Sequence, residues 1–282
     1  MKSPTTIAFL GPKGTFTELA ALEHFGSGGV FKAYASIDDV FTAVAQKHVT
    51  FGVVPVENST EGAVNNTHDC LMDSLVRIVG EVTLPVEHHF LVGKGNNAGA
   101  LIKIASHKQS FAQCRKWILR NYPKAELVEC ASNAEAAKLA ASEESTGAIA
   151  GKRAADTYGL VSIDQKIQDQ QNNYTRFLVL SDEDARPALK NKTSLIIYAE
   201  NRPGSLYRIL EPFENLQISL TKIETRPSKI EAWAYVFFID FEGHITDQSV
   251  EKALIRLRKC AAEIKILGSY PVFQTEHRNF SA

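Results

Sequence analysis

Short apolar runs alternate with helix-like patterns through the first part of the chain. Residues 6–10 and 51–55 are apolar runs of the kind that builds a buried strand. Between them, Val40, Phe41 and Val44 recur at helical spacing after Ser36. Further along, the same criteria predict strands at 101–106, 125–128 and 147–150 and helices at 111–121 and 134–141. This alternation predicts an α/β layer with a mainly parallel sheet.

The chain is expected to cross between two such units twice. Around 76–84 and 90–93 it passes into a second unit, and the apolar run 177–180 needs a sheet of the first unit to join. We therefore predict a first domain over residues 1–182, with lobe one at about 1–78 and 160–182 and lobe two at about 79–159. Two lobes with a double crossing form a cleft, and the crossing loops are expected to carry ligand groups.

A polar, acidic segment over 181–187 has the composition of a linker. Beyond it the pattern changes to strand, helix, strand, strand, helix and strand, at 193–198, 206–213, 219–225, 232–241, 249–258 and 264–269. That order is the ferredoxin-like one. It predicts a second, α+β domain over residues 192–273.

Composition narrows the possible functions. The 282 residues have a formal net charge of −1, which gives no general attraction to nucleic acid or to an anionic membrane. The four cysteines form no C-x-x-C pair, and His68, His88 and His89 have no Asp or Glu at helical spacing, so neither a disulfide framework nor a metal site is expected. Since we find no signal peptide and no apolar stretch long enough to span a bilayer, we expect a reduced, cytoplasmic protein.

Two polar clusters follow strands of the predicted first lobe. In the loop 11–15, Thr15 and Glu18 have the spacing of a capping box, and a helix N-terminus beside Lys13 suits an anion, although a tight turn alone would explain the glycines. After the strand 51–55, Asn58, Ser59 and Thr60 can donate and accept hydrogen bonds without charge. The alternative for this segment is a helix start capped by Ser59 or Thr60.

Two further clusters stand later in the chain. Residues 106–110 follow the first strand of the second unit and include His107 and Gln109, while Ser132 and Glu135 repeat the spacing of a capping box. Thr175 and Arg176 stand before the apolar run that begins at Phe177. Arginine recognises carboxylates with two hydrogen bonds, and a well-positioned hydroxyl can pass a proton to a leaving oxygen. The alternative is an edge-strand threonine beside an exposed arginine.

Taken together, these segments resemble the prephenate dehydratase family. The motifs that carry the resemblance lie at 11–16, 54–62, 106–109, 167–169 and 173–177, and residues 201–206 and 224–227 are similar to the phenylalanine-binding motifs of an ACT domain. The resemblance implies a two-lobed, periplasmic-binding-protein-like α/β catalytic domain followed by a ferredoxin-like ACT domain. No chorismate mutase helices are expected before it, as in monofunctional members.

The resemblance also implies the reaction, in which prephenate loses carbon dioxide and water to give phenylpyruvate without cofactor or metal. Thr175 would assist departure of the ring hydroxyl, and Arg176 would anchor a carboxylate. The substrate-binding set that it implies is Thr15, Glu57, Asn58, Ser59, Thr60, His107, Gln109 and Phe177, of which Phe177 is also expected to pack into the core. Lys108 stands where the family motif has proline, which alters the loop and adds a charge.

By the same resemblance, L-phenylalanine would bind the ACT domain and favour a less active arrangement of the lobes. The residues implied in effector binding are Asn201, Pro203, Gly204, Ser205, Leu206 and Glu224, where Ser205 and Thr225 depart from the commoner alanine and serine. We expect a homodimer or homotetramer. Two alternatives remain open at this point: an arogenate dehydratase, and a non-catalytic two-lobed sensor that binds its ligand without turnover.

Overall fold

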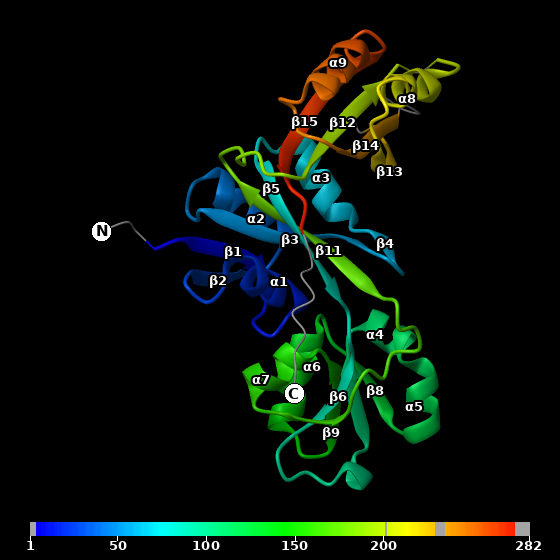
Figure 1. Cartoon of the computed structure of the whole chain (residues 1–282). Coiled ribbons are helices and arrows are strands. Elements are labelled where there is room, and N and C mark those ends of the chain that lie inside the picture. The colour runs from blue at the N-terminus through cyan, green and yellow to red at the C-terminus, as the bar shows by residue number, and fades with distance from the viewer. Residues whose placement is uncertain (1–3, 201, 229–234, 274–282) are drawn as a thin grey trace.

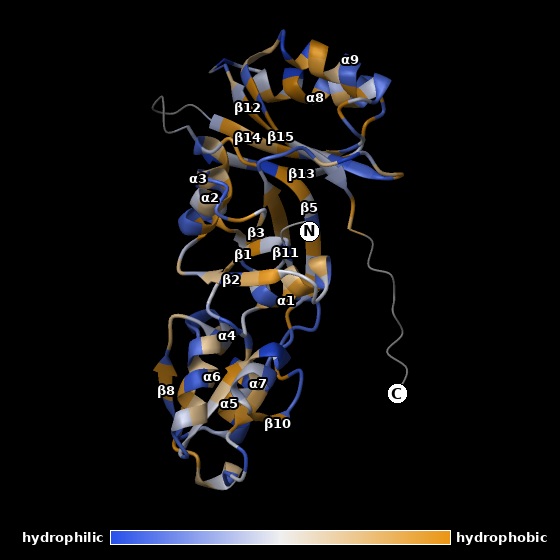
Figure 2. Cartoon of the chain, turned by 90° about the vertical axis from the view of Figure 1, so that its left-hand side faces the viewer, coloured by the Kyte–Doolittle hydropathy of each residue, from blue (hydrophilic) through white to orange (hydrophobic). Residues whose placement is uncertain are grey.

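The computed structural model describes residues 4–200, 202–228 and 235–273. Three units lie in a row, with lobe one in the middle, lobe two on one side and the C-terminal domain on the other (Figure 1). The view turned by 90° shows the same order (Figure 2). Within the described residues, no helix is long and apolar enough to cross a membrane.

Lobe one is built on a six-stranded sheet in the order β2-β1-β3-β11-β5, with β4 paired to β3. Its strands are β1 (Thr6–Leu10), β2 (Val30–Tyr34), β3 (Phe51–Asn58), β4 (Gly62–Ala63), β5 (Arg77–Pro85) and β11 (Tyr174–Ser181). One face packs on α1 (Phe16–Phe25) through a core that includes Phe9, Val53 and Phe177. The other face packs on α2 (Ile37–Ala45) and α3 (Asn65–Asp73).

Lobe two holds a five-stranded sheet in the order β10-β6-β9-β7-β8. The strands are β6 (His89–Val92), β7 (Lys103–Ser106), β8 (Glu126–Glu129), β9 (Thr146–Ala150) and β10 (Val161–Asp164). Its helices are η1 (Ala98–Ala100), α4 (Lys108–Gln113), α5 (Arg115–Asn121), α6 (Asn133–Ser142) and α7 (Lys152–Tyr158). The single helix predicted over 111–121 is therefore two helices, which meet at Cys114.

The α/β class is confirmed, but the sheets are mixed, not mainly parallel. The chain passes between the lobes twice, each time later than the predicted limits of about 79 and 160, because β5 still pairs in the sheet of lobe one and β10 in that of lobe two. In lobe one, β11 runs antiparallel to both β3 and β5. In lobe two, β6 runs antiparallel to β9 and β10. These antiparallel pairs result from the double crossing. β6 is the first strand after the chain enters lobe two, and β11 is the first strand after it returns to lobe one.

Side-chain caps begin the helices predicted to have them. The hydroxyl oxygens of Thr15 and Ser132 accept from the backbone N–H groups of Glu18 and Glu135, at 3.3 and 3.0 Å. The glutamate carboxylates, however, accept from the residue before the cap, Gly14 at 2.6 Å and Ala131 at 2.9 Å. Both predicted helix starts are thus confirmed. The difference is that each glutamate accepts from the residue before the N-cap, whereas in a capping box it accepts from the N-cap residue itself.

The C-terminal domain has the ferredoxin-like order that the sequence predicts. Its strands are β12 (Asn191–Ala199), β13 (Leu220–Pro227), β14 (Tyr235–Glu242) and β15 (Ala261–Pro271), in the order β13-β14-β12-β15. The helices α8 (Ser205–Asn215) and α9 (Gln248–Leu257) cover the outer face of this sheet (Figure 2).

The inner face of the C-terminal sheet packs directly on lobe one. Ile196, Phe238 and Leu267 share one apolar core with Leu178 and with helices α2 and α3. At Gly268 the approach is so close that a Cβ atom would lie 2.1 Å from the backbone oxygen of Ile78. Because buried apolar contacts are continuous across it, this interface is expected to hold the two domains in a defined arrangement.

Candidate active site

A cleft between the two lobes contains most of the polar residues that the sequence singled out. Two cavities of about 270 and 400 Å³ lie along it. They form one continuous cleft because both are lined by Leu10, Phe16, Pro55, His107, Gln109, Asn133 and Thr175. A cleft of this size, with an apolar lining and a few convergent polar groups, has the properties of a small-molecule site.

Thr175 lies on the wall that lobe one contributes, where β11 leaves the second crossing. The side-chain amide of Asn58 on β3 donates to Thr175 Oγ1 at 2.9 Å and to Asn173 Oδ1 at 2.8 Å. The Asn58 oxygen is fixed in turn by the backbone N–H groups of Thr60 and Glu61. Within the described part of the chain, Thr175 Oγ1 has no acceptor for its own hydrogen, so that hydrogen is available to a bound molecule.

The crossings between the lobes meet at Gln113 of α4. Its side-chain oxygen is 2.8 Å from His88 Nε2 and accepts from Asn173 Nδ2 at 3.1 Å, and its amide donates to Glu61 at 3.3 Å. Burial lowers the pKa of His88, whose Nδ1 has no hydrogen-bond partner among the described residues. A neutral His88 therefore donates to Gln113, and Gln113 in turn binds Asn173, directly before the strand that carries Thr175.

Lobe two contributes a second polar wall around Asn133, the first residue of α6. Its side-chain oxygen accepts from the hydroxyls of Ser106 and Ser110 and from the backbone N–H of His107, at 3.1, 2.9 and 3.1 Å. His107 is the N-cap of α4 and its Nδ1 accepts from the backbone N–H of Gln109. The acceptor at Nδ1 leaves the Nε2–H of a neutral His107 as a donor on the cleft side.

Two longer helices begin at the cleft and make it favourable for anions. The first residues of α1, Phe16 and Thr17, and of α6, Asn133 and Ala134, line the 270 Å³ cavity. Both helices are ten residues long, and the N-terminal amides of a helix attract negative charge. Lys152, the first residue of α7, is exposed and lines the same cavity.

Glu18 joins the two lobes beside this cavity. It is 4% exposed, and its carboxylate binds Arg153 of lobe two at 3.1 and 3.2 Å as well as the backbone N–H of Gly14. Gly14 has a φ of +88°, and a Cβ atom there would lie 3.2 Å from the Cα of Ala154. Arg153 is therefore committed to holding the lobes together, which leaves Lys152 as the cation of the cleft lining with no ion pair in the described part of the chain.

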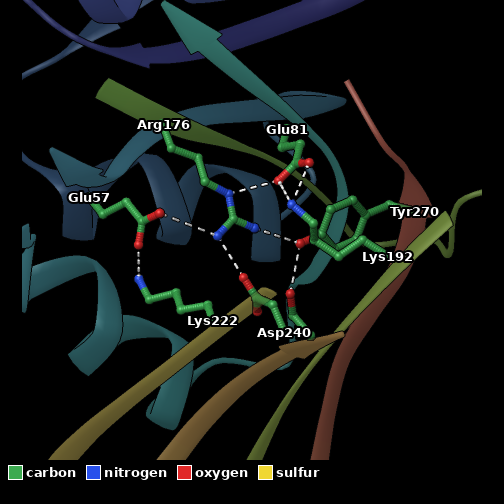
Figure 3. Close-up of polar contacts among 8 residues, drawn as sticks. Glu57, Glu81, Arg176, Lys192, Lys222, Asp240 and Tyr270 are labelled. Atoms are coloured by element: carbon green, nitrogen blue, oxygen red, sulfur yellow. Dashed lines mark hydrogen bonds and ion pairs between the residues drawn. The ribbon is translucent and has the colours of Figure 1, made fainter. Parts of the chain in front are cut away.

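The expectation that Arg176 faces the cleft with Thr175 is corrected by the structure. Both residues belong to β11, where neighbouring side chains point to opposite faces, so Thr175 faces the cleft and Arg176 faces the C-terminal domain. Figure 3 shows the guanidinium surrounded by carboxylates from three directions. Arg176 is 9% exposed and lines neither cavity of the cleft.

Each of the three nitrogens of the Arg176 guanidinium makes a hydrogen bond. Nε donates to Glu81 at 2.7 Å, Nη1 to Asp240 at 2.6 Å and Nη2 to the Tyr270 hydroxyl at 3.0 Å. Burial by itself would lower the pKa of Arg176, but the charges of Asp240 and Glu81 more than offset this and raise it. Burial raises the pKa of Tyr270. The site is thus a charged cluster between domains, which we call the Arg176 cluster.

Glu57 is likewise not a cleft residue. It precedes Asn58 on β3 and points to the other face, where it pairs with Lys222 of the C-terminal domain and lies 3.8 Å from Arg176. The strand β3 continues through this segment instead of ending near residue 55, and the alternation of its side chains separates Glu57 from Asn58.

Ser59 and Thr60 fasten the crossing and do not line the two cavities. Ser59 Oγ accepts from the backbone N–H of Tyr174 at 2.9 Å, and Thr60 Oγ1 donates to Asn173 at 3.4 Å. Neither caps a helix, because α3 begins at Asn65 with no side-chain cap. Their effect on a ligand is therefore indirect, through the position of the second crossing.

The remaining predicted residues lie where a substrate would reach them or close by. Thr15, His107, Gln109 and Phe177 line the 270 Å³ cavity, although Phe177 is only 1% exposed and belongs mainly to the core. Lys108 is an exposed residue at the start of α4 and lines neither cavity. The roles of these residues toward substrate stay predictions.

Three cleft residues were missed from the sequence: Gln113, Asn133 and Lys152. Asn133 follows the predicted cap Ser132 directly, so the capping signal already placed it at a helix start beside the cleft. Gln113 and Lys152 stand in helix-forming segments with no motif of their own. Their position at the cleft depends on how the two lobes meet.

The residues implied in effector binding lie at the start of α8 and on β13. Gly204 precedes the helix with a φ of +76°, and Ser205 Oγ donates to the backbone oxygens of Glu200 and Arg202. Pro203 and Leu206 are exposed, and Glu224 is half-buried on β13. Asn201 lies outside the described residues. Their binding of an effector remains a prediction.

Comparison with known proteins gives the family. A sequence profile described as prephenate dehydratase matches residues 7–185, and one described as ACT domain matches residues 193–259. The bifunctional chorismate mutase/prephenate dehydratase of Pseudomonas aeruginosa is 48% identical over 271 residues, which cover 96% of this chain and 74% of that protein.

Two further relatives are similar over nearly their whole length. The prephenate dehydratase of Bacillus subtilis is 35% identical over 282 residues, covering 95% of this chain and 99% of that protein. The crystal structure of the prephenate dehydratase from Arthrobacter aurescens in complex with L-Phe superposes with a TM-score of 0.86 at 30% identity, covering 94% of this chain and 90% of that one. The chain therefore belongs to the prephenate dehydratase family, with an ACT domain following its two-lobed unit.

Proposed function

We propose that this chain converts prephenate to phenylpyruvate, carbon dioxide and water, a step of L-phenylalanine synthesis. Family membership supports the reaction, and the cleft supports the substrate class, because its helix N-termini and Lys152 suit a small dianion. The observation that carries the proposal most directly is the position of Thr175, whose hydroxyl accepts from Asn58 and keeps its own hydrogen for the cleft.

The chemistry needs little from the protein beyond positioning. The bond to the ring carboxylate breaks and its electron pair enters the ring, while the bond to the ring hydroxyl breaks and that oxygen leaves with a proton as water. The ring becomes aromatic in the same process, which drives it. Threonine is too weak an acid to release its proton fully, so Thr175 acts as a fixed donor to the departing oxygen, and solvent ultimately supplies the proton.

The substrate carboxylates need partners other than Arg176. The N-termini of α1 and α6 and the ammonium group of Lys152 surround the cavity into which Thr175 faces. His107 Nε2 and the side chain of Gln109 add hydrogen-bond donors on the opposite wall. We therefore assign one carboxylate to Lys152 and the start of α6, and the other to the start of α1.

Regulation by L-phenylalanine is part of the proposal. The ACT domain matched over 193–259 and the relative crystallised with L-Phe support it. Several large apolar side chains of this domain are exposed, as expected where a second subunit packs: Leu206, Tyr207, Ile223 and Tyr235. We propose that the chain acts as a homodimer or homotetramer and that the effector binds near the start of α8.

Turnover of two substrates by the purified protein tests the proposal. Phenylpyruvate formation from prephenate at a higher kcat/KM than phenylalanine formation from arogenate is the expected result. A preference for arogenate would keep the chemistry and change the substrate. Tight binding of either compound without turnover would instead indicate the sensor, and would contradict the role given to Thr175.

A further inference from the structure

The Arg176 cluster connects the strand that carries Thr175 to two strands of the ACT sheet, the inner strand β14 and the edge strand β15. Arg176 lies on β11, Glu81 on the neighbouring β5, Asp240 on β14 and Tyr270 on β15 (Figure 3). The four side chains are almost completely buried, at 9, 4, 7 and 0% exposed. Lys192 of β12 adds a second cation, at 2.7 and 2.8 Å from the two Glu81 oxygens.

Charge balance makes this cluster sensitive to where the ACT domain sits. Three ion pairs cross the interface around Arg176: Arg176 with Asp240, Lys192 with Glu81, and Lys222 with Glu57. Within lobe one, Arg176 also lies close to Glu81 and Glu57. Buried charges are tolerated only while their partners stay in contact. A shift of the ACT sheet relative to lobe one therefore cannot leave the Arg176 guanidinium in place, because two of its bonds end on that sheet.

Thr175 is the next residue along the same strand, so a displaced Arg176 moves it. Backbone pairing joins Thr175 to Asn58 on one side and to Leu84 on the other. Its register with β3 is interrupted directly after Arg176, where Arg176 faces Glu57 and Phe177 faces Pro55. The extra residue at this bulge is Val56 of β3. It lets the end of β3, with Asn58 and the Thr175 hydroxyl that Asn58 holds, change direction without unfolding the rest of the sheet.

We propose that Arg176 is a positioning residue through which the ACT domain sets the hydroxyl of Thr175, so that an effector bound to the ACT domain alters turnover by way of this cluster. The inference rests on the proposed function for its activity readout. It assigns to the arginine of this motif a contact with the regulatory domain in place of a contact with substrate. The physical link is a single strand with the hydroxyl on one face and the charged contact on the other.

The same interface offers a matched control. Lys265 of β15 also crosses it, and its Nζ donates to the backbone oxygens of Leu71, Met72 and Ser74 at 2.9, 2.7 and 2.6 Å. These oxygens lie at the C-terminal end of α3, which does not carry Thr175. Lys265→Met thus removes a charged contact between the domains and leaves the Arg176 cluster complete, whereas Asp240→Asn removes one charge from that cluster with almost no change in shape.

The experiment compares the unmodified protein with Asp240→Asn, Tyr270→Phe and Lys265→Met. Phenylalanine binding is measured by calorimetry, its effect on kcat/KM for prephenate by steady-state kinetics, and its effect on the amides of residues 174–181 by hydrogen exchange. Coupling between two sites typically changes such a constant by roughly 5- to 150-fold. In Asp240→Asn we expect phenylalanine to bind while that change falls close to one, with Tyr270→Phe intermediate and Lys265→Met like the unmodified protein.

Two outcomes overturn the inference. The first is an Asp240→Asn variant that responds to phenylalanine as the unmodified protein does, and the second is an equal loss of response in Asp240→Asn and Lys265→Met, which would point to the interface as a whole. Unmodified protein that binds no phenylalanine also overturns it, without affecting the dehydratase reaction. If prephenate is not turned over, the proposed function fails, and the hydrogen-exchange comparison still decides whether the cluster couples the ACT domain to β11.

Discussion

The two faces of β11 have opposite chemistry. On the cleft face, Thr175 is partly exposed, and among the described residues its hydroxyl is bonded only to the neutral amide of Asn58. On the other face, one residue further, Arg176 is bonded to two carboxylates and a phenol and is sealed beneath the ACT domain. One face keeps a weak donor free for a ligand, and the other uses a strong donor completely within the protein.

The difference shows how one short motif can serve two purposes. A strand turns consecutive side chains to opposite faces, so residues adjacent in sequence can belong to an active site and to a domain interface. A hydroxyl is useful in the cleft because leaving it without a hydrogen-bond partner there costs little free energy. A buried arginine without a carboxylate partner would cost much more, because its charge has lost its water. Substitutions on the two faces should therefore fail in different ways.

The largest effect is expected on the cleft face, with Thr175→Val. The change removes the hydroxyl while keeping the shape, so kcat should fall by about 10²–10⁴, the range contributed by a positioned proton donor. Folding should be nearly unaffected because Asn58 retains its bond to Asn173. Steady-state kinetics with prephenate and circular dichroism check both points, and Thr175→Ser, which restores a hydroxyl, should recover part of the rate. A Val variant with normal kcat would remove Thr175 from the mechanism.

On the interface face, Arg176→Met should act mainly on stability. It leaves Asp240 without its cation and Glu81 with Lys192 alone, so the free energy of unfolding should fall by roughly 3–5 kcal/mol. Urea denaturation of this variant and of Arg226→Gln measures the difference. Arg226→Gln should lose less free energy of unfolding, because the ion pair of Arg226 with Asp69 is less buried than that of Arg176 with Glu81. Equal stability of Arg176→Met and the unmodified protein would contradict the importance of the buried cluster.

A smaller effect is expected for Lys152→Met, which removes the free cation of the cleft. Loss of one charge-assisted hydrogen bond of about 1.5 kcal/mol or more corresponds to roughly a tenfold or greater rise in KM for prephenate. Because the contact is made in the ground state as well, kcat should change little. Lys108→Met is the matched control, since Lys108 is exposed and lines neither cavity, and its KM should stay unchanged. A normal KM in Lys152→Met would assign the carboxylates to the helix N-termini alone.

The smallest effect concerns pH and the crossing behind the cleft. Burial lowers the pKa of His88 below its ordinary value of 6.5, and that of His68 likewise, so below about pH 6.5 the unfolded chain binds protons that the folded chain does not. The free energy of unfolding should therefore fall as the pH drops from 6.5 toward the folded pKa values, and should not depend on these groups above that range. Denaturation curves at several pH values measure the slope, which His88→Gln should reduce. An unchanged slope in that variant would show that His88 does not contribute.

Several features could be read from local sequence because local physics decides them. The hydroxyls of Thr15 and Ser132 cap the helices that their spacing predicts, since capping involves residues only three positions apart. The apolar runs became the predicted strands, and the ferredoxin-like order followed from their sequence. The limits of those strands were less certain, and extending β11 back to Tyr174 would already have placed Thr175 and Arg176 on opposite faces.

The sequence by itself thus determined most of the strands and helices, the double crossing and the motifs that place the chain in its family, whereas β2, β10 and α7 were not predicted. Only the tertiary structure decided what each polar residue touches. Arg176 meets Asp240 across 64 positions and Glu81 across 95, and Gln113 meets Asn173 across 60. Such contacts depend on how sheets from separate parts of the chain stack, and burial then makes a charged residue bind whichever partner the stacking supplies.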